Sequence, residues 1–179
     1  MHKAGFVNII GNPNVGKSTL MNAFVGEKLS IITSKAQTTR HRIFGIVSSD
    51  DFQIVFSDTP GIIKPSYALQ ASMMDFVKSA FEDADILIYM VEIGEKELKD
   101  EAFFKRINQL DVPVLLLINK VDTSDQSVLE EQVAYWKEKV PRAEIYPISA
   151  LRNFQTEVVF NRIIELLPES PAFFPKDQI

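Results

Sequence analysis

The sequence predicts an α/β domain built on a six-stranded, mostly parallel sheet with one antiparallel strand and about five helices. Short apolar runs typical of buried strands alternate with longer segments of helical periodicity along most of the chain. The second and third apolar runs are separated only by Ser48–Asp51, and a connection this short favours an antiparallel hairpin. The remaining strands are therefore expected to be parallel and to be joined through helices.

The expected elements follow one another in a regular order. Strands are predicted at residues 5–10, 43–47, 52–57, 86–91, 112–118 and 144–148. The run Ile86–Val91 is apolar without interruption, as expected for a strand covered on both faces of the sheet. Pro113 is tolerable because it lies near the start of its strand. Helices are predicted at residues 19–25, 67–81, 97–110, 127–139 and 156–167.

Length and composition fit one ordinary globular domain. The chain has 179 residues, of which 46% are hydrophobic and 24% charged. It has no apolar run long enough to cross a membrane, and its first strand begins too early to leave room for a signal peptide. The absence of cysteine excludes disulfides and thiolate metal sites and fits a reducing compartment. A net charge of −5 argues against a dedicated nucleic-acid binder.

Residues 11–18, Gly-Asn-Pro-Asn-Val-Gly-Lys-Ser, fit the phosphate-binding pattern G-x-x-x-x-G-K-[ST] and lie between an expected strand and an expected helix. Gly11 and Gly16 allow backbone angles and a close approach that a Cβ would prevent. The N–H groups of such a loop point to one anion, at the positive end of the helix dipole. Lys17 supplies an ammonium group for the outer phosphates, and the Ser18 hydroxyl can ligate Mg²⁺.

A second motif, Asp-Thr-Pro-Gly at residues 58–61, directly follows the third expected strand. Ligands bind at the carboxyl ends of strands in such sheets, so Asp58 is expected near the phosphates, where its carboxylate can hold Mg²⁺ through a water. The N–H of Gly61 can contact the terminal phosphate. This short motif means little alone, and its place at a strand end after the phosphate loop gives it weight.

A third motif, Asn-Lys-Val-Asp at residues 119–122, ends the fifth expected strand. A buried Asp122 carboxylate can accept the two N–H bonds that guanine offers and adenine lacks. Asn119 is expected to tie this loop to the phosphate loop, and the stem of Lys120 to cover one face of the base. Ser149 and Ala150 follow the sixth strand, where the Ala150 N–H can contact the guanine oxygen. The predicted nucleotide-binding residues are Gly11, Asn12, Asn14, Val15, Gly16, Lys17, Ser18, Thr19, Asp58, Gly61, Asn119, Lys120, Asp122, Ser149 and Ala150.

These motifs, in this order, resemble those of the translation-factor-type GTPases from about Phe6 to Leu167. Three finer features look like the Era family of bacterial ribosome-assembly GTPases. They are the Asn-Pro-Asn of the phosphate loop, Lys-Ala-Gln-Thr-Thr-Arg-His-Arg-Ile at residues 35–43, and Phe-Pro-Lys-Asp-Gln-Ile at residues 174–179. The resemblance implies a P-loop GTPase domain that binds GTP and GDP with Mg²⁺ and slowly hydrolyses GTP.

The resemblance also implies a domain organisation. Residues 1–168 would form the GTPase domain, and residues 169–179 would link it to a C-terminal KH-type RNA-binding domain outside this chain. Three prolines in Pro168–Asp177 favour a linker, and a packed tail is the alternative. Through the KH domain, the whole protein would bind small-subunit rRNA and the ribosome. It would be a cytoplasmic monomer, and the family allows peripheral association with the inner face of the cell membrane.

P-loop GTPases close a loop when the γ-phosphate and Mg²⁺ recruit a threonine hydroxyl. Thr39 is predicted for this role, and Thr38 is the alternative. The basic residues around them, in the segment 35–42, are either a contact for RNA or another partner or a solvated loop.

Ile62 follows Gly61 where many related GTPases carry a glutamine that orients the attacking water, and isoleucine has no group for that task. In related GTPases with asparagine at the position of Asn14, K⁺ can bind beside the phosphates; the alternative is an asparagine that only satisfies the loop backbone. The predicted catalytic residues are Lys17, Thr39, Gly61 and Asn14. The predicted metal ligands are Ser18, Thr39 and Asp58 for Mg²⁺ and Asn14 for K⁺.

Other functions stay open at this point. A P-loop kinase or ATPase shares the first motif but gives no reason for Asn119 and Asp122. A module that holds guanine nucleotide without turning it over is kept open by Ile62. Within GTPases, a tandem-domain ribosome GTPase or a tRNA-modification GTPase is the alternative. The segment 151–155 lacks the glycine often seen after the Ser-Ala element in such families.

Overall fold

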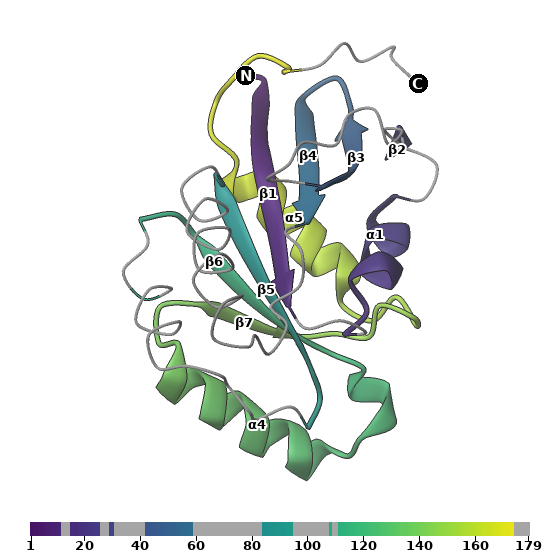
Figure 1. The fold of residues 1–179 in the computed structure, drawn as a ribbon, viewed down its shortest axis with the longest axis vertical. Helices are drawn as coiled ribbons and strands as arrows, with labels where there is room; N and C mark the ends of the chain where they lie inside the picture. The colour runs from purple at the N-terminus through teal and green to yellow at the C-terminus, as the bar shows by residue number, and fades with distance from the viewer. Residues whose placement is uncertain are drawn as a thin grey trace, which may run out of the picture.

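The computed structural model describes residues 1–11, 15–25, 29–30, 42–58, 84–94, 108 and 111–173. Within these residues, seven strands form one sheet in the order β2-β3-β4-β1-β5-β6-β7 (Figure 1). The strands are β1 (Lys3–Gly11), β2 (Leu29–Ser30), β3 (Arg42–Ser48), β4 (Phe52–Asp58), β5 (Ile86–Glu92), β6 (Val114–Asn119) and β7 (Glu144–Pro147). The helices are α1 (Lys17–Val25), the 3₁₀ turn η2 (Val121–Thr123), α4 (Gln126–Lys139) and α5 (Thr156–Leu166).

The predicted α/β fold class is confirmed. Strand β1 is parallel to β4 and β5, β5 is parallel to β6, and β6 is parallel to β7. Strands β3 and β4 form the expected antiparallel hairpin. The six predicted strands are all present, and the two-residue β2 adds an antiparallel partner to β3. The predicted helices at 67–81 and 97–110 lie outside the described residues, apart from Asn108.

Two apolar clusters cover the two faces of the sheet. Even-numbered side chains from Ile86 to Met90 pack in a cluster with Leu20 of α1 and Ile163 of α5. Odd-numbered side chains from Leu87 to Val91 pack in a second cluster with Trp136 of α4. Successive side chains of a strand point to opposite faces, so β5 is buried on both sides and its unbroken apolar run is explained. In Figure 1, α1 and α5 lie next to each other, away from α4.

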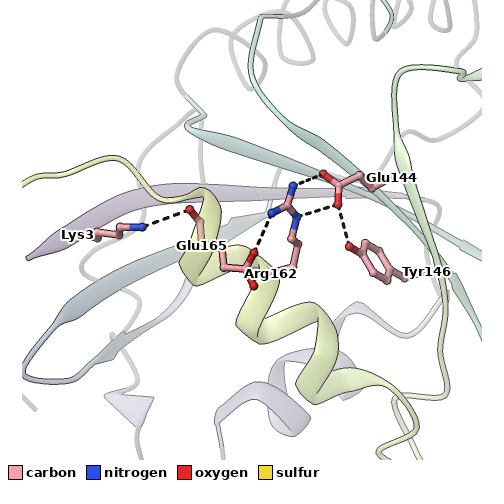
Figure 2. A network of polar contacts seen from close by, with 5 residues as sticks. All are labelled: Lys3, Glu144, Tyr146, Arg162 and Glu165. Atoms are coloured by element: carbon pink, nitrogen blue, oxygen red, sulfur yellow. Dashed lines mark hydrogen bonds and ion pairs between the residues drawn. The ribbon is translucent and has the colours of Figure 1, made fainter.

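Polar contacts attach α5 to the last strand (Figure 2). The Arg162 guanidinium donates to both carboxylate oxygens of Glu144 at 2.9 Å and to Glu165 at 2.9 Å. The Tyr146 hydroxyl donates to Glu144 at 2.8 Å, and the Lys3 ammonium donates to the Glu165 carbonyl at 3.3 Å. This network therefore links β1, β7 and α5.

None of the helices in the described ranges is long and apolar enough to cross a membrane.

The described part of the predicted linker, residues 169–173, lies against the N-terminal strand. The Ser170 N–H donates to the His2 carbonyl at 3.0 Å. The Phe173 ring lies 5.0 Å from the Phe6 ring, and the Phe173 N–H donates to the buried amide of Gln53 at 2.8 Å. These contacts reach as far as Phe173, which is 46% exposed, and residues 174–179 lie outside the described part.

The Glu144–Arg162 pair should make stability depend on pH. Hydrogen bonds from Arg162 hold the pKa of the Glu144 carboxyl below its ordinary value of 4.5, with Tyr146 adding to the effect against the cost of burial. A lowered folded-state pKa stabilises the protein above the unfolded-state pKa, and this contribution is lost as the pH falls through the folded-state pKa. Glu144→Gln should therefore lower the free energy of unfolding at neutral pH. The loss should be only about 0.5–1 kcal/mol, because solvent screens the pair.

Urea unfolding of wild type and Glu144→Gln at neutral and acid pH measures this difference. We expect the two proteins to converge in acid. Glu138→Gln, which removes an exposed carboxylate from α4, is the matched control and should stay close to wild type at both pH values. A Glu144→Gln penalty that is equally large in acid would contradict the assignment.

Candidate functional site

The ends of the phosphate loop are packed too tightly for any residue larger than glycine. Gly16 has a φ of +105°, and a Cβ there would lie 2.3 Å from the Asn119 side-chain nitrogen. A Cβ on Gly11 would lie 2.5 Å from the Met90 carbonyl oxygen. Packing against β5 and β6 is thus a second reason for these glycines, besides the close approach of a ligand. Residues 12–14 lie outside the described part of the loop.

Helix α1 begins at Lys17, directly after this loop. Its first backbone bond runs from the Leu20 N–H to the Gly16 carbonyl at 2.9 Å. The Lys17 ammonium donates to the Gly11 carbonyl at 3.3 Å, so the side chain turns back toward the end of β1, and Ser18 is exposed beside it. An ammonium group, a hydroxyl and the positive end of a helix dipole thus lie together, which suits an anion.

The second motif reaches the same edge of the sheet. Asp58 is the last residue of β4 and pairs with Ile9 of the parallel strand β1, two positions before Gly11. The backbone of Asp58 is therefore next to the strand that leads into the phosphate loop, as the topology predicted. The Asp58 side chain, Thr38, Thr39, Gly61 and Ile62 lie outside the described residues, so the structure does not place these predicted groups.

One buried side chain joins three of the predicted loops. Asn119 ends β6 and is 3% exposed. Its amide donates to the Val15 carbonyl at 2.8 Å, and its amide oxygen accepts from the Ala150 N–H at 2.9 Å. The structure thus contains the expected tie to the phosphate loop and adds a second one to the loop after β7. The Ala150 N–H that donates in this second bond is the group predicted to contact guanine.

Lys120 occupies an unusual backbone conformation. Its φ of 67° and ψ of 30° are left-handed, which is uncommon for a residue with a Cβ. The Lys120 carbonyl accepts from the Thr123 N–H at 3.0 Å and from the Thr123 hydroxyl at 2.7 Å. Its ammonium lies 2.8 Å from a carboxylate oxygen of Glu92, the last residue of β5. Thr123 therefore holds the backbone of Lys120, and Glu92 holds its side chain.

Asp122 lies in η2 beside an open cavity. Its side chain is 27% exposed and not buried as expected, and it lies 3.7 Å from the Arg152 guanidinium. The cavity, of about 560 Å³, lies between the start of α4 and the loop after β7. Its lining includes Asp122, Leu129, Ser149, Arg152 and Phe154. Of the predicted base-site residues, this cavity is lined by Asp122 and Ser149 but not by Lys120 or Ala150.

Sequence reasoning missed Glu92. Its carboxylate contacts the lysine of the third motif, although the two residues are far apart in the sequence. The carboxyl-edge rule for parallel sheets could have found it, because Glu92 ends the strand next to the one that Asn119 ends. The Arg152 contact with Asp122 was also not foreseen.

Comparisons with known proteins agree with this geometry. The model of a family described as 50S ribosome-binding GTPase matches residues 6–120. GTPase Era of Alkaliphilus metalliredigens is 41% identical over 179 residues, which are 99% of this chain and 61% of that protein. GTPase Era of Clostridium kluyveri is 39% identical over 183 residues, 100% of this chain and 61% of that protein. The chain thus spans about three fifths of the curated relatives it matches.

Two solved Era structures are also similar. Aquifex aeolicus Era, as a variant bound to GDP and AlF₄⁻, is 38% identical with a TM-score of 0.78, over 98% of this chain and 60% of that one. Era in complex with MgGDPNP and nucleotides 1506–1542 of 16S ribosomal RNA is 38% identical with a TM-score of 0.79, over 99% of this chain and 61% of that one. The predicted resemblance to Era is confirmed, and the chain belongs to the 50S ribosome-binding GTPase family.

Proposed function

We propose that this chain is the guanine-nucleotide switch of an Era-type protein, which binds GTP with Mg²⁺ and slowly hydrolyses it to GDP. The observation that carries the proposal is the buried Asn119 amide, which holds the third motif against the phosphate loop. A kinase or ATPase would share the loop without needing this connection to a guanine-reading aspartate. The two halves of the site are therefore built to hold one ligand with phosphates at one end and a base at the other.

The residues at the carboxyl edge fit Mg²⁺. Ser18 presents an exposed hydroxyl at the start of α1, and Asp58 ends the neighbouring strand β4. Oxygen donors of these kinds are what Mg²⁺ prefers. We assign Ser18, Asp58 and Thr39 to hold the ion, which would neutralise charge on the phosphate oxygens when bound.

The predicted switch elements remain part of the proposal. Thr39 and the Gly61 N–H would be recruited by the γ-phosphate and released after hydrolysis. Lys17 would stabilise charge that develops during phosphoryl transfer, which needs positioning and electrostatics more than covalent chemistry. Since Ile62 cannot orient water, we assign Asn14 to hold K⁺ beside the phosphates as the compensating charge.

The output of the switch would involve ribosomal RNA. The family description names the 50S subunit, whereas the Era structure at 38% identity contains 16S ribosomal RNA, which belongs to the small subunit. We follow the more similar protein and propose that the whole protein acts in small-subunit assembly, through a KH-type domain after the segment that ends at Ile179. Monomeric state and peripheral membrane association remain predictions from the same resemblance.

Nucleotide competition tests whether Asp122 selects guanine over adenine. Unlabelled GTP should displace bound fluorescent GDP, whereas ATP should not. Asp122→Asn should weaken GDP binding about 10- to 100-fold, because it replaces charge-assisted hydrogen bonds. The same change should improve binding of XDP, since the new amide can donate to the xanthine oxygen that replaces the guanine amino group. If ATP displaced the bound fluorescent GDP as effectively as GTP does, the proposal would be wrong.

Gly16→Ala tests the packing between the phosphate loop and Asn119. The new Cβ would lie 2.3 Å from the Asn119 amide nitrogen, at a φ of +105°. We expect loss of measurable GDP binding, in addition to about 1–3 kcal/mol of backbone strain. Gly94→Ala is a matched control, because Gly94 has a φ of +92° with nothing within 4 Å of its Cβ position. It should show the strain in unfolding experiments and keep GDP binding.

Single-turnover GTP hydrolysis in KCl and in NaCl tests the assignment of Asn14. Hydrolysis should be faster in KCl, and Asn14→Ala should remove the difference between the two salts because the cation loses a ligand. Phosphate release would be followed after mixing enzyme saturated with GTP and excess Mg²⁺. Equal rates in both salts would reject the K⁺ assignment, and no release above buffer in either would favour the non-hydrolysing module.

A further inference from the structure

We propose that Glu92 is a positioning residue that sets how long guanine nucleotide stays bound, by holding the Lys120 side chain over the base. The inference rests on the proposed function, because it takes Lys120 as part of the base site. Glu92 contributes no atom to the predicted phosphate or base contacts. Its effect would therefore pass entirely through Lys120.

The two residues meet because of strand register. Glu92 ends β5 and pairs with Asn119, the last residue of the parallel strand β6, so Lys120 follows immediately beside it. The Glu92 carboxylate lies 2.8 Å from the Lys120 ammonium, and each side chain is 41% exposed. The contact is thus a charged hydrogen bond at the rim of the site, where solvent weakens it without removing it.

The Glu92 end of this contact is rigid. The amide of Gln132, a buried residue of α4, donates to the Glu92 carbonyl at 3.1 Å. The Gln132 amide oxygen also accepts from the Gly94 N–H. The Ile93 N–H donates to the Asn119 carbonyl at 2.8 Å. Bonds on both sides of Glu92 therefore fix its backbone to α4 and to β6.

The Lys120 end has a fixed backbone and a flexible side chain. Its left-handed backbone sets the direction in which the side chain leaves the loop, and Thr123 holds the carbonyl. The four-carbon stem can still adopt many rotamers, and each bond formed by the ammonium restricts them. Glu92 selects rotamers in which the stem can lie along a base face, so less freedom is lost when nucleotide binds.

The expected effect is modest because the pair is partly exposed. Glu92→Gln keeps the shape and removes the charge, and should raise the GDP dissociation rate about three- to fivefold, equivalent to about 0.7–1 kcal/mol. Glu92→Asp should recover part of the loss. High salt should bring the wild-type rate toward that of Glu92→Gln, because it screens the ion pair. Single-turnover hydrolysis, measured with the enzyme in saturating excess over GTP, should not change, since Glu92 makes none of the predicted phosphate contacts.

Fluorescent GDP release from the whole chain is the experiment, with a double-mutant cycle that uses Lys120→Met, which keeps an apolar stem without its charge. If Glu92 acts through Lys120, Glu92→Gln should have no further effect in the Lys120→Met background. Glu130→Gln, on the exposed face of α4, is the matched control and should release GDP like wild type.

Two results would overturn the inference while the proposed function stands. One is a Glu92→Gln release rate equal to wild type, and the other is a full effect that persists in the Lys120→Met background. Melting of the nucleotide-free variants separates loss of positioning from loss of fold, because loss of fold would lower the midpoint well beyond the small shift expected from one exposed ion pair. If ATP displaced bound GDP from the wild-type protein as effectively as GTP does, the proposed function and this inference would both be overturned.

Discussion

The Asn119 side chain is the contact on which the rest of the site depends. A buried amide needs partners for its donor and its acceptor, and both partners here are backbone groups of other loops. Val15 belongs to the phosphate loop and Ala150 to the loop after β7, so two distant parts of the chain are held at fixed separation. The same amide occupies the space where a side chain on residue 16 would lie, which makes glycine necessary there.

The sheet puts Asn119 where it can make these bonds. Strands β5 and β6 are buried on both faces between the two apolar clusters, so their carboxyl ends are fixed by packing that does not depend on the ligand. Parallel strands bring the ends of β1, β4, β5 and β6 to one edge. The segments that follow β1, β4 and β6 carry the first three predicted motifs, and the Ser-Ala element follows β7. The polar site is therefore positioned by an apolar scaffold, and its own bonds only join loops that already lie close.

The sequence predicted those parts of the protein that show a hydrophobic periodicity or a motif with a fixed residue spacing. The six longer strands and the described helices α1, α4 and α5 follow from apolar runs and helical periodicity, and the motifs follow from strand ends. Strand β2 has only two residues and so shows no pattern, because its existence depends on pairing with β3.

The sequence could not show pairs brought together by the fold. Glu92 meets Lys120 through the register of β5 and β6, whereas Glu144 of β7 meets Arg162 because α5 packs beside that strand. The bond from Ala150 to Asn119 was missed for a related reason. A motif names the residues of a site, but the choice between a ligand and a neighbouring side chain as partner depends on geometry.

The most direct test of the central role of Asn119 is the stabilisation of Asn119→Asp by GDP. The change keeps the size of the side chain and an acceptor for the Ala150 N–H, but it removes the donor to the Val15 carbonyl and places a carboxylate there. We predict that the nucleotide-free variant still melts cooperatively, and that GDP with Mg²⁺, at a concentration that saturates the wild-type protein, no longer raises its melting temperature. A GDP-induced shift equal to that of wild type would contradict the account.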